Sequence, residues 1–131
     1  MTMSAEPKPL VLIVDDADDN RTMYAEFLSF SGFRVIEAAD GADAIEKATR
    51  LLPDVIVTDL VLPITDGWEA TRRLKDSAAT RHIPIVALSG NSSESGPGRL
   101  SAAGFDAFFV KPCAPDALVN KLYELIGRKP V

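Results

Sequence analysis

The stretch that decides the fold is Leu10-Val-Leu-Ile-Val14, followed at once by Asp15-Asp16. Five aliphatic residues in a row are typical of a strand that is buried on both faces, as in a parallel sheet covered by helices. An acidic pair directly after such a strand lies at its carboxyl end, which is where open α/β sheets bind ligands. This stretch therefore predicts an α/β sheet with chemical groups gathered at one edge.

Four further apolar runs alternate with stretches whose apolar residues recur every three or four positions, the pattern of helices. This rhythm predicts one α/β domain, a doubly wound (βα)5 unit with a parallel five-stranded sheet. The expected strands are Leu10–Val14, Arg34–Glu37, Val55–Thr58, Ile85–Leu88 and Ala107–Val110.

Capping residues and stops mark the helices between these strands. Asp18 or Asp19 is placed to cap the first helix, which Gly32 would end, and Asp40 and Asp66 are placed to cap the second and third. On the first helix, one face would contain three apolar residues: Met23, Phe27 and Phe30.

The fourth helical segment is the weakest, because residues 89–98 consist of turn formers and helix breakers. We expect a long mobile loop there, then about two turns of helix from Pro97 to Ala103 and a stop at Gly104. The fifth helix has Pro115 in its first turn and ends at Gly127.

The composition is that of one soluble globular domain, with 131 residues, 47% of them hydrophobic and 25% charged. A formal net charge of −5 argues against nucleic acid and anionic membrane as partners. The polar start has no apolar signal segment and there is one cysteine, so we expect a cytoplasmic protein. We expect a disordered tail at 1–9, the domain at 10–127 and a short tail at 128–131.

In a parallel sheet the carboxyl ends of all strands meet at one edge, and the sequence places five polar side chains there. Three carboxylates would repel one another by on the order of 4 kcal/mol per pair at about 4 Å and an effective dielectric near 20. A divalent cation would relieve this repulsion, and oxygen ligands without histidine or cysteine favour Mg²⁺. Mg²⁺ beside a lysine and a hydroxyl would bind a phosphoryl group, which predicts phosphoryl transfer. The five residues are Asp15, Asp16, Asp59, Ser89 and Lys111.

These residues resemble the receiver domain of two-component response regulators, and the resemblance runs nearly end to end. It implies a flavodoxin-like fold, strand order 2-1-3-4-5 and a cis peptide before Pro112. The similar motifs are Val-Leu-Ile-Val-Asp15-Asp16, Asp59-Leu-Val-Leu-Pro63-Ile-Thr-Asp66-Gly67, Ile-Val-Ala-Leu-Ser89 and Lys111-Pro112.

The resemblance implies a metal site and a nucleophile. By position, Asp59 is similar to the residue that binds the metal and becomes phosphorylated. Asp16 is similar to a residue that binds the metal directly. Asp15 is similar to a residue that assists metal binding, either through a water molecule or by contacting a direct ligand. The main-chain carbonyl of Val61 would complete the protein ligands of Mg²⁺.

The resemblance also implies a switch. Ser89 is similar to the hydroxyl that turns toward the phosphoryl group, Lys111 to its ion-pair partner, and Phe108 to an aromatic residue that follows the hydroxyl. From the spacing of apolar residues alone, Phe108 is expected to be a core residue. Cys113 and Trp68 are given no part in the chemistry.

A stand-alone regulator of the chemotaxis type is thereby implied, acting in a phosphorelay. Its donor would be a phosphohistidine of a sensor kinase or phosphotransfer protein. Its output would be a protein target bound on the face formed by the helix at 97–103, the strand at 107–110 and the last helix. It would be no enzyme beyond phosphorylating and dephosphorylating itself.

Two alternatives stay open. A receiver-like interaction module that is never phosphorylated would typically lack an acid or the lysine, and here all are present. A Mg²⁺-dependent aspartyl phosphohydrolase of the haloacid dehalogenase type places a second acid two residues after its nucleophile, where this chain has Val61. Val61 and Asn91 lie where family members tune the phosphoryl lifetime, and Gly96 and Gly98 weaken the fourth helix of the output face.

Overall fold

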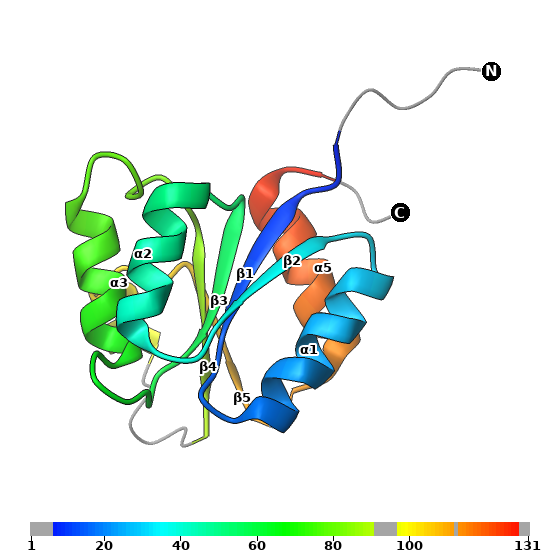
Figure 1. The fold of residues 1–131 in the computed structure, drawn as a ribbon, viewed down its shortest axis with the longest axis horizontal. Coiled ribbons are helices and arrows are strands. Elements are labelled where there is room, and N and C mark those ends of the chain that lie inside the picture. The colour runs from blue at the N-terminus through cyan, green and yellow to red at the C-terminus, as the bar shows by residue number, and fades with distance from the viewer. Residues whose placement is uncertain (1–6, 91–96, 112, 129–131) are drawn as a thin grey trace.

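The computed structural model describes residues 7–90, 97–111 and 113–128, which form strictly alternating strands and helices (Figure 1). The strands are β1 (Leu10–Val14), β2 (Arg34–Ala38), β3 (Val55–Asp59), β4 (Ile85–Ser89) and β5 (Ala107–Val110). The helices are α1 (Asp18–Phe30), α2 (Gly41–Leu51), α3 (Gly67–Asp76), α4 (Pro97–Ala102) and α5 (Pro115–Ile126).

The five strands form one parallel sheet in the order β2-β1-β3-β4-β5. This confirms the α/β class, the flavodoxin-like topology and the strand order that the sequence predicts. The chain turns back across the sheet between β1 and β3, so the switch point of the topology lies between the carboxyl ends of these two strands. That is the position at which open α/β sheets bind their ligands.

The sheet separates two apolar clusters, one on each face. Helices α1 and α5 cover one face, and α2 and α3 cover the other (Figure 1). Leu28 of α1 and Leu122 of α5 are fully buried in the first cluster, and Leu100 fixes the short α4 to the second. With both faces covered, β1, β3 and β4 are buried along their length, as their unbroken aliphatic sequences predict.

Strands β2, β3 and β4 extend one residue beyond the predicted ends. The sequence analysis placed their ends at the last residue of each run, but the parallel ladder continues through the next residue. Asp59 lies opposite Leu88, and Ser89 lies opposite Val110. These two polar residues are therefore held in the sheet and not in the loops that follow it.

The cap of α1 is not an aspartate, so the prediction for Asp18 or Asp19 is wrong. Both lie in the first turn, and the N-cap residue is Ala17, which makes no side-chain cap. The main-chain N–H of Ala17 donates to Asp15 Oδ1 at 2.9 Å, so the helix starts directly after the acidic pair. The two aspartates in the first turn still interact favourably with the helix dipole.

The buried face of α1 also differs from the prediction. Tyr24 and Leu28 face the sheet, whereas Phe30 is 90% exposed and Met23 is 47% exposed. Phe27 is partly buried against the same cluster. The helix has apolar residues on two adjoining sides with the same helical spacing, and periodicity alone does not select between them.

The predicted caps of α2 and α3 are confirmed. Asp40 Oδ1 accepts a hydrogen bond from the N–H of Asp43 at 2.8 Å, and Asp66 Oδ1 accepts one from the N–H of Glu69 at 2.9 Å. Helix α4 ends at Ala102, one residue before the predicted end. Positive φ angles, which glycine adopts without strain, occur after α1, α4 and α5 at Gly32, Gly104 and Gly127.

Some expectations fall outside the described residues. Residues 91–96 of the loop predicted at 89–98, among them Asn91 and Gly96, lie outside the described residues, and so does the cis peptide at Pro112, so both stay predictions. The domain boundaries also stay a prediction, although Arg128 Nη1 donates to the carbonyl of Pro7 at 2.7 Å within the described chain. No helix in the described ranges has the length and apolar character to cross a bilayer.

Two glycines allow the loop between β3 and α3 to pack tightly. A Cβ at Gly41 would overlap the carbonyl of Thr65, and a Cβ at Gly67 would overlap the carbonyl of Asp59 and lie 2.9 Å from Leu60 Cα. Both obstacles are main-chain atoms, which cannot turn aside as a side chain can. The start of α3 is therefore packed directly against the end of β3.

We expect Gly67→Ala to lower the free energy of unfolding by about 1–3 kcal/mol, the usual cost of overpacking. Urea denaturation followed by circular dichroism measures this change. The matched control is Gly98→Ala in α4, where an added Cβ meets nothing within 4 Å, and we expect no loss of stability there. Equal stability of the two variants would contradict the tight packing at Gly67.

Candidate functional site

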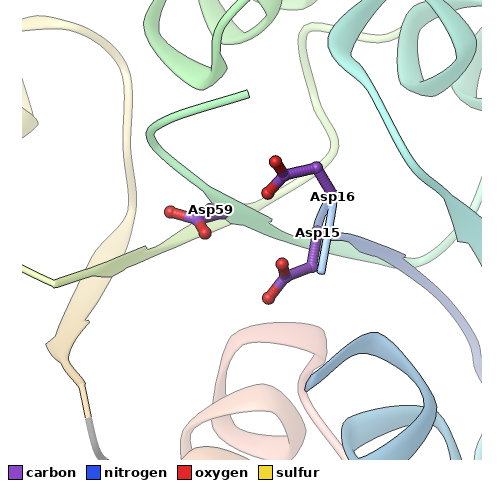
Figure 2. Close-up of side chains that lie close together, drawn as sticks. All are labelled: Asp15, Asp16 and Asp59. Atoms are coloured by element: carbon purple, nitrogen blue, oxygen red, sulfur yellow. The ribbon is translucent and has the colours of Figure 1, made fainter. Parts of the chain in front are cut away.

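Three carboxyl groups meet where β1 and β3 end. Asp15 and Asp16 follow β1 directly, and Asp59 is the last residue of β3. One carboxylate oxygen of each lies within 4.8 Å of those of the other two. Figure 2 shows the three carboxyl groups turned to the same side of the strand ends. The sheet topology thus brings together residues that are more than forty positions apart in the sequence.

Asp15 is held firmly from both of its oxygens. The residue Asp15 is 1% exposed. Its Oδ1 accepts a hydrogen bond from the N–H of Ala17, and its Oδ2 accepts one from Lys111 Nζ at 3.2 Å. Asp16, its neighbour, is exposed to solvent. One member of the acidic pair is therefore a fixed, buried charge, and the other is accessible to a ligand.

Asp59 is oriented in the same way from two sides. Its Oδ1 accepts from the N–H of Val61 at 3.3 Å, and its Oδ2 accepts from Lys111 Nζ at 3.0 Å. The side chain is 14% exposed, so it is fixed and still reachable from solvent. A carboxylate held in this way presents an oxygen to an incoming group without first having to order itself.

Lys111 joins the two strand ends electrostatically. Its main-chain N–H donates to the carbonyl of Ser89 at 2.7 Å, which places the residue beside β4. Burial lowers the pKa of Lys111, but hydrogen bonds and charges of Asp59 and Asp15 outweigh burial, and the pKa is raised above its ordinary value. The ammonium therefore stays charged, and one positive charge faces three carboxyl groups.

The proposed switch residues lie on β4, the strand next to that of Asp59, and on β5, the strand beyond it. Ser89 ends β4 and is 4% exposed. Phe108 of β5 lies opposite Ala87 and is partly buried against the cluster on the α2 and α3 face. The Val61 side chain is 75% exposed. The roles of Ser89, Phe108 and the Val61 carbonyl stay predictions.

Arg21 is a residue of this site that the sequence analysis missed. Its Nη1 donates to the main-chain carbonyl of Asp15 at 2.9 Å, its Nε to Glu37 at 3.0 Å and its Nη2 to Asp18 at 2.7 Å. The hydrogen bond with Asp18, more than any other contact, raises the pKa of Arg21, and Glu37 adds to the effect against burial. The arginine ties the acidic turn to α1 and β2. The signal in the sequence that could have identified Arg21 was its position in the first turns of the helix that follows the acidic pair, within reach of that pair.

The donor set fits a hard divalent cation. In the described ranges, these three aspartates are the group of metal-ligating side chains that lies close enough to share an ion. All the donors are carboxylate oxygens, and three carboxylates against one ammonium leave an excess of negative charge. Mg²⁺ prefers such ligands and keeps several waters, which the exposed side of Asp16 leaves room for.

The family model of the response regulator receiver domain matches residues 11–123. The polar-differentiation response regulator DivK of Brucella anthropi is 29% identical over 117 residues, which cover 89% of this chain and 95% of DivK. The receiver domain of the sensor histidine kinase PA1611 of Pseudomonas aeruginosa, crystallised with a magnesium ion coordinated in its active-site cleft, is similar with a TM-score of 0.85. It has 32% sequence identity and covers 92% of this chain and 98% of its own. The chemotaxis response regulator CheY4 of Vibrio cholerae has a TM-score of 0.83 and 30% identity, covering 90% and 98%.

We expect Mg²⁺ to stabilise the protein through this cluster. At a free concentration 100 times its dissociation constant, a ligand of the folded state adds about 2.7 kcal/mol to the free energy of unfolding. Urea denaturation with and without Mg²⁺ measures the gain. Asp16→Asn should abolish most of this gain in stability, because the substitution removes the negative charge of a solvent-accessible ligand oxygen.

The control for that experiment is Asp19→Asn, an exposed aspartate in the first turn of α1 outside the cluster. This variant should keep the full gain from Mg²⁺. If Asp16→Asn and Asp19→Asn respond alike, the cation is bound elsewhere.

Proposed function

Because the chain belongs to the response regulator receiver domain family, we propose that Asp59 is the phosphoacceptor of a two-component phosphorelay. The observation that carries the proposal is the position of Lys111 Nζ, 3.0 Å from Asp59 and 3.2 Å from Asp15. An ammonium in contact with the acceptor carboxylate is placed to neutralise the negative charge of a phosphoryl group attached to that carboxylate. The donor is a phosphohistidine of a sensor kinase or a phosphotransfer protein.

The transfer is a nucleophilic substitution at phosphorus. An oxygen of the Asp59 carboxylate forms the new O–P bond while the P–N bond to the donor imidazole breaks, and the electron pair leaves with the imidazole nitrogen. The product is an acyl phosphate. Hydrogen bonds from Val61 N–H and Lys111 hold the Asp59 carboxylate in place beforehand, which reduces the entropic cost of attack.

Asp15, Asp16 and Asp59 are the residues that would hold Mg²⁺, with the Val61 carbonyl as a further ligand. When bound there, the cation neutralises charge on the oxygens of the transferring group. Lys111 contributes a second positive charge, and its raised pKa keeps that charge at physiological pH. Arg21 fixes the acidic turn through the Asp15 carbonyl.

Phosphorylation replaces one negative charge of Asp59 by a dianionic group. We propose that this draws Ser89 and Lys111 toward the phosphoryl oxygens, and that Phe108 follows Ser89. The resulting shift between two states is read by a protein target on the α4-β5-α5 face. A hollow of about 370 Å³ on this face, lined in part by Leu100, Phe105 and Phe108, supports a binding role for it.

We propose further that the protein is cytoplasmic and that it is not an enzyme that turns over other substrates. A single cysteine and an acidic, soluble composition support the former. Against a phosphohydrolase, the position two residues after Asp59 is Val61, whose exposed aliphatic side chain has no proton to give or take. Against an inert module, all four charged residues of the site are present and in contact distance.

We expect acetyl phosphate with Mg²⁺ to label the protein at one phosphoryl group per chain. Asp59→Asn should abolish the label, because an amide is a poor nucleophile for phosphorus. Intact-protein mass spectrometry measures the label, and Asp19→Asn, which keeps the acidic cluster, should be labelled like the unaltered protein.

The alternative functions give different results in the same assay. Many turnovers of a small phosphate ester would indicate a phosphohydrolase. No label on Asp59 under any donor would indicate an interaction module that is not phosphorylated.

A further inference from the structure

A side-chain hydrogen bond links α1 to Cys113, shortly after Lys111. Cys113 lies two residues after Lys111, between β5 and α5, and its Sγ is 3.5 Å from Tyr24 Oη of α1. Tyr24 is 4% exposed, and Cys113 is partly buried against the same apolar cluster. The bond thus joins two segments that are 89 positions apart in the chain.

The segment around Lys111 needs such an anchor because it leaves the sheet there. Val110 is the last residue of β5, and Lys111 keeps one main-chain hydrogen bond to β4, its N–H to the Ser89 carbonyl. Helix α5 begins only at Pro115. Within this short connection, the side chain of Cys113 reaches across to α1.

Tyr24 also lies beside the acidic site. It lines the same surface hollow as Lys111, together with Met23 and Gly90. Burial raises the pKa of the Tyr24 hydroxyl above its ordinary value, and the hydrogen bond to Cys113 and the charges of nearby Asp15 and Asp59 raise it further. The hydroxyl therefore stays a neutral group able to share a proton with the sulfur.

We propose that Tyr24 and Cys113 are positioning residues, whose hydrogen bond fixes the chain at Cys113 so that Lys111 Nζ stays between Asp59 and Asp15. The inference rests on the proposed function in one respect: it takes Lys111 to act on the phosphoryl group at Asp59. Lysine has a long side chain with many rotamers, so its head group is placed only if the main chain around it is held. The Ser89 carbonyl holds the main chain of Lys111 itself, and the Tyr24 contact holds Cys113, two residues further on.

The test compares rate constants for labelling by saturating acetyl phosphate with Mg²⁺. Tyr24→Phe and Cys113→Ala each remove the hydrogen bond and should slow labelling by about 3- to 10-fold, the scale of one hydrogen bond. Cys113→Ser keeps a hydrogen-bonding group and should remain close to the unaltered rate. Because both changes break the same bond, the double variant Tyr24→Phe/Cys113→Ala should be no slower than the slower single variant.

A matched control separates positioning from general loss of stability. Tyr123 is also a buried tyrosine, 2% exposed, and its hydroxyl donates to the Ser31 carbonyl at 2.7 Å, beyond the end of α1 that is remote from the acidic pair. Tyr123→Phe should lower the thermal midpoint as much as Tyr24→Phe does but leave the labelling rate unchanged.

Three results would overturn the proposal. These are unaltered rates in Tyr24→Phe and Cys113→Ala, a Cys113→Ser variant as slow as Cys113→Ala, or equal slowing by Tyr123→Phe. In each of them Asp59 is still labelled, so the proposed function survives. Absence of any label in the unaltered protein would overturn the proposed function and the positioning role together.

Discussion

Electrostatic repulsion among three carboxyl groups is the constraint on which the site depends. Asp15, Asp16 and Asp59 offer oxygens within 4.8 Å of one another, a distance at which like charges cost several kcal/mol unless they are compensated. Lys111 supplies one compensating charge by bonding to two of the three. The remaining excess of negative charge makes the cluster receptive to a divalent cation and, once that is bound, to a phosphoryl group. The fold keeps these charges together because the ends of the neighbouring strands β1 and β3 bear the residues that carry them.

The sheet and the identity of the charged residues could be predicted because both depend on local patterns. Apolar runs identified the strands, most clearly the aliphatic run of β1, and the helix caps at Asp40 and Asp66 follow from residue type alone. The cap and buried face of α1 could not, because they depend on how the helix meets the sheet. Asp15, which is part of the site, accepts from the N–H of Ala17, and the N-cap position falls on Ala17, whose side chain cannot cap. Phe30 has the spacing of a core residue and is nevertheless exposed.

Contacts between distant segments were the other part that the sequence did not reveal. Arg21 bonds to a main-chain carbonyl, and a carbonyl leaves no trace in residue type. Tyr24 and Cys113 meet across 89 positions, and neither is unusual in its own segment. The three aspartates and Lys111 were therefore predictable, whereas the contacts of Arg21 and the Tyr24–Cys113 contact became visible only in three dimensions.

The division of labour between strands and helices has an evolutionary consequence. The acidic cluster and its lysine stand at strand ends, on a framework clamped between two separate apolar layers, whereas the outward sides of the helices take no part in the acidic cluster. If the proposed function holds, surface substitutions on the helices can thus change which proteins bind without disturbing the reaction. The products of duplicated genes with this architecture can diverge in the proteins that they bind while the reaction at the strand ends stays the same.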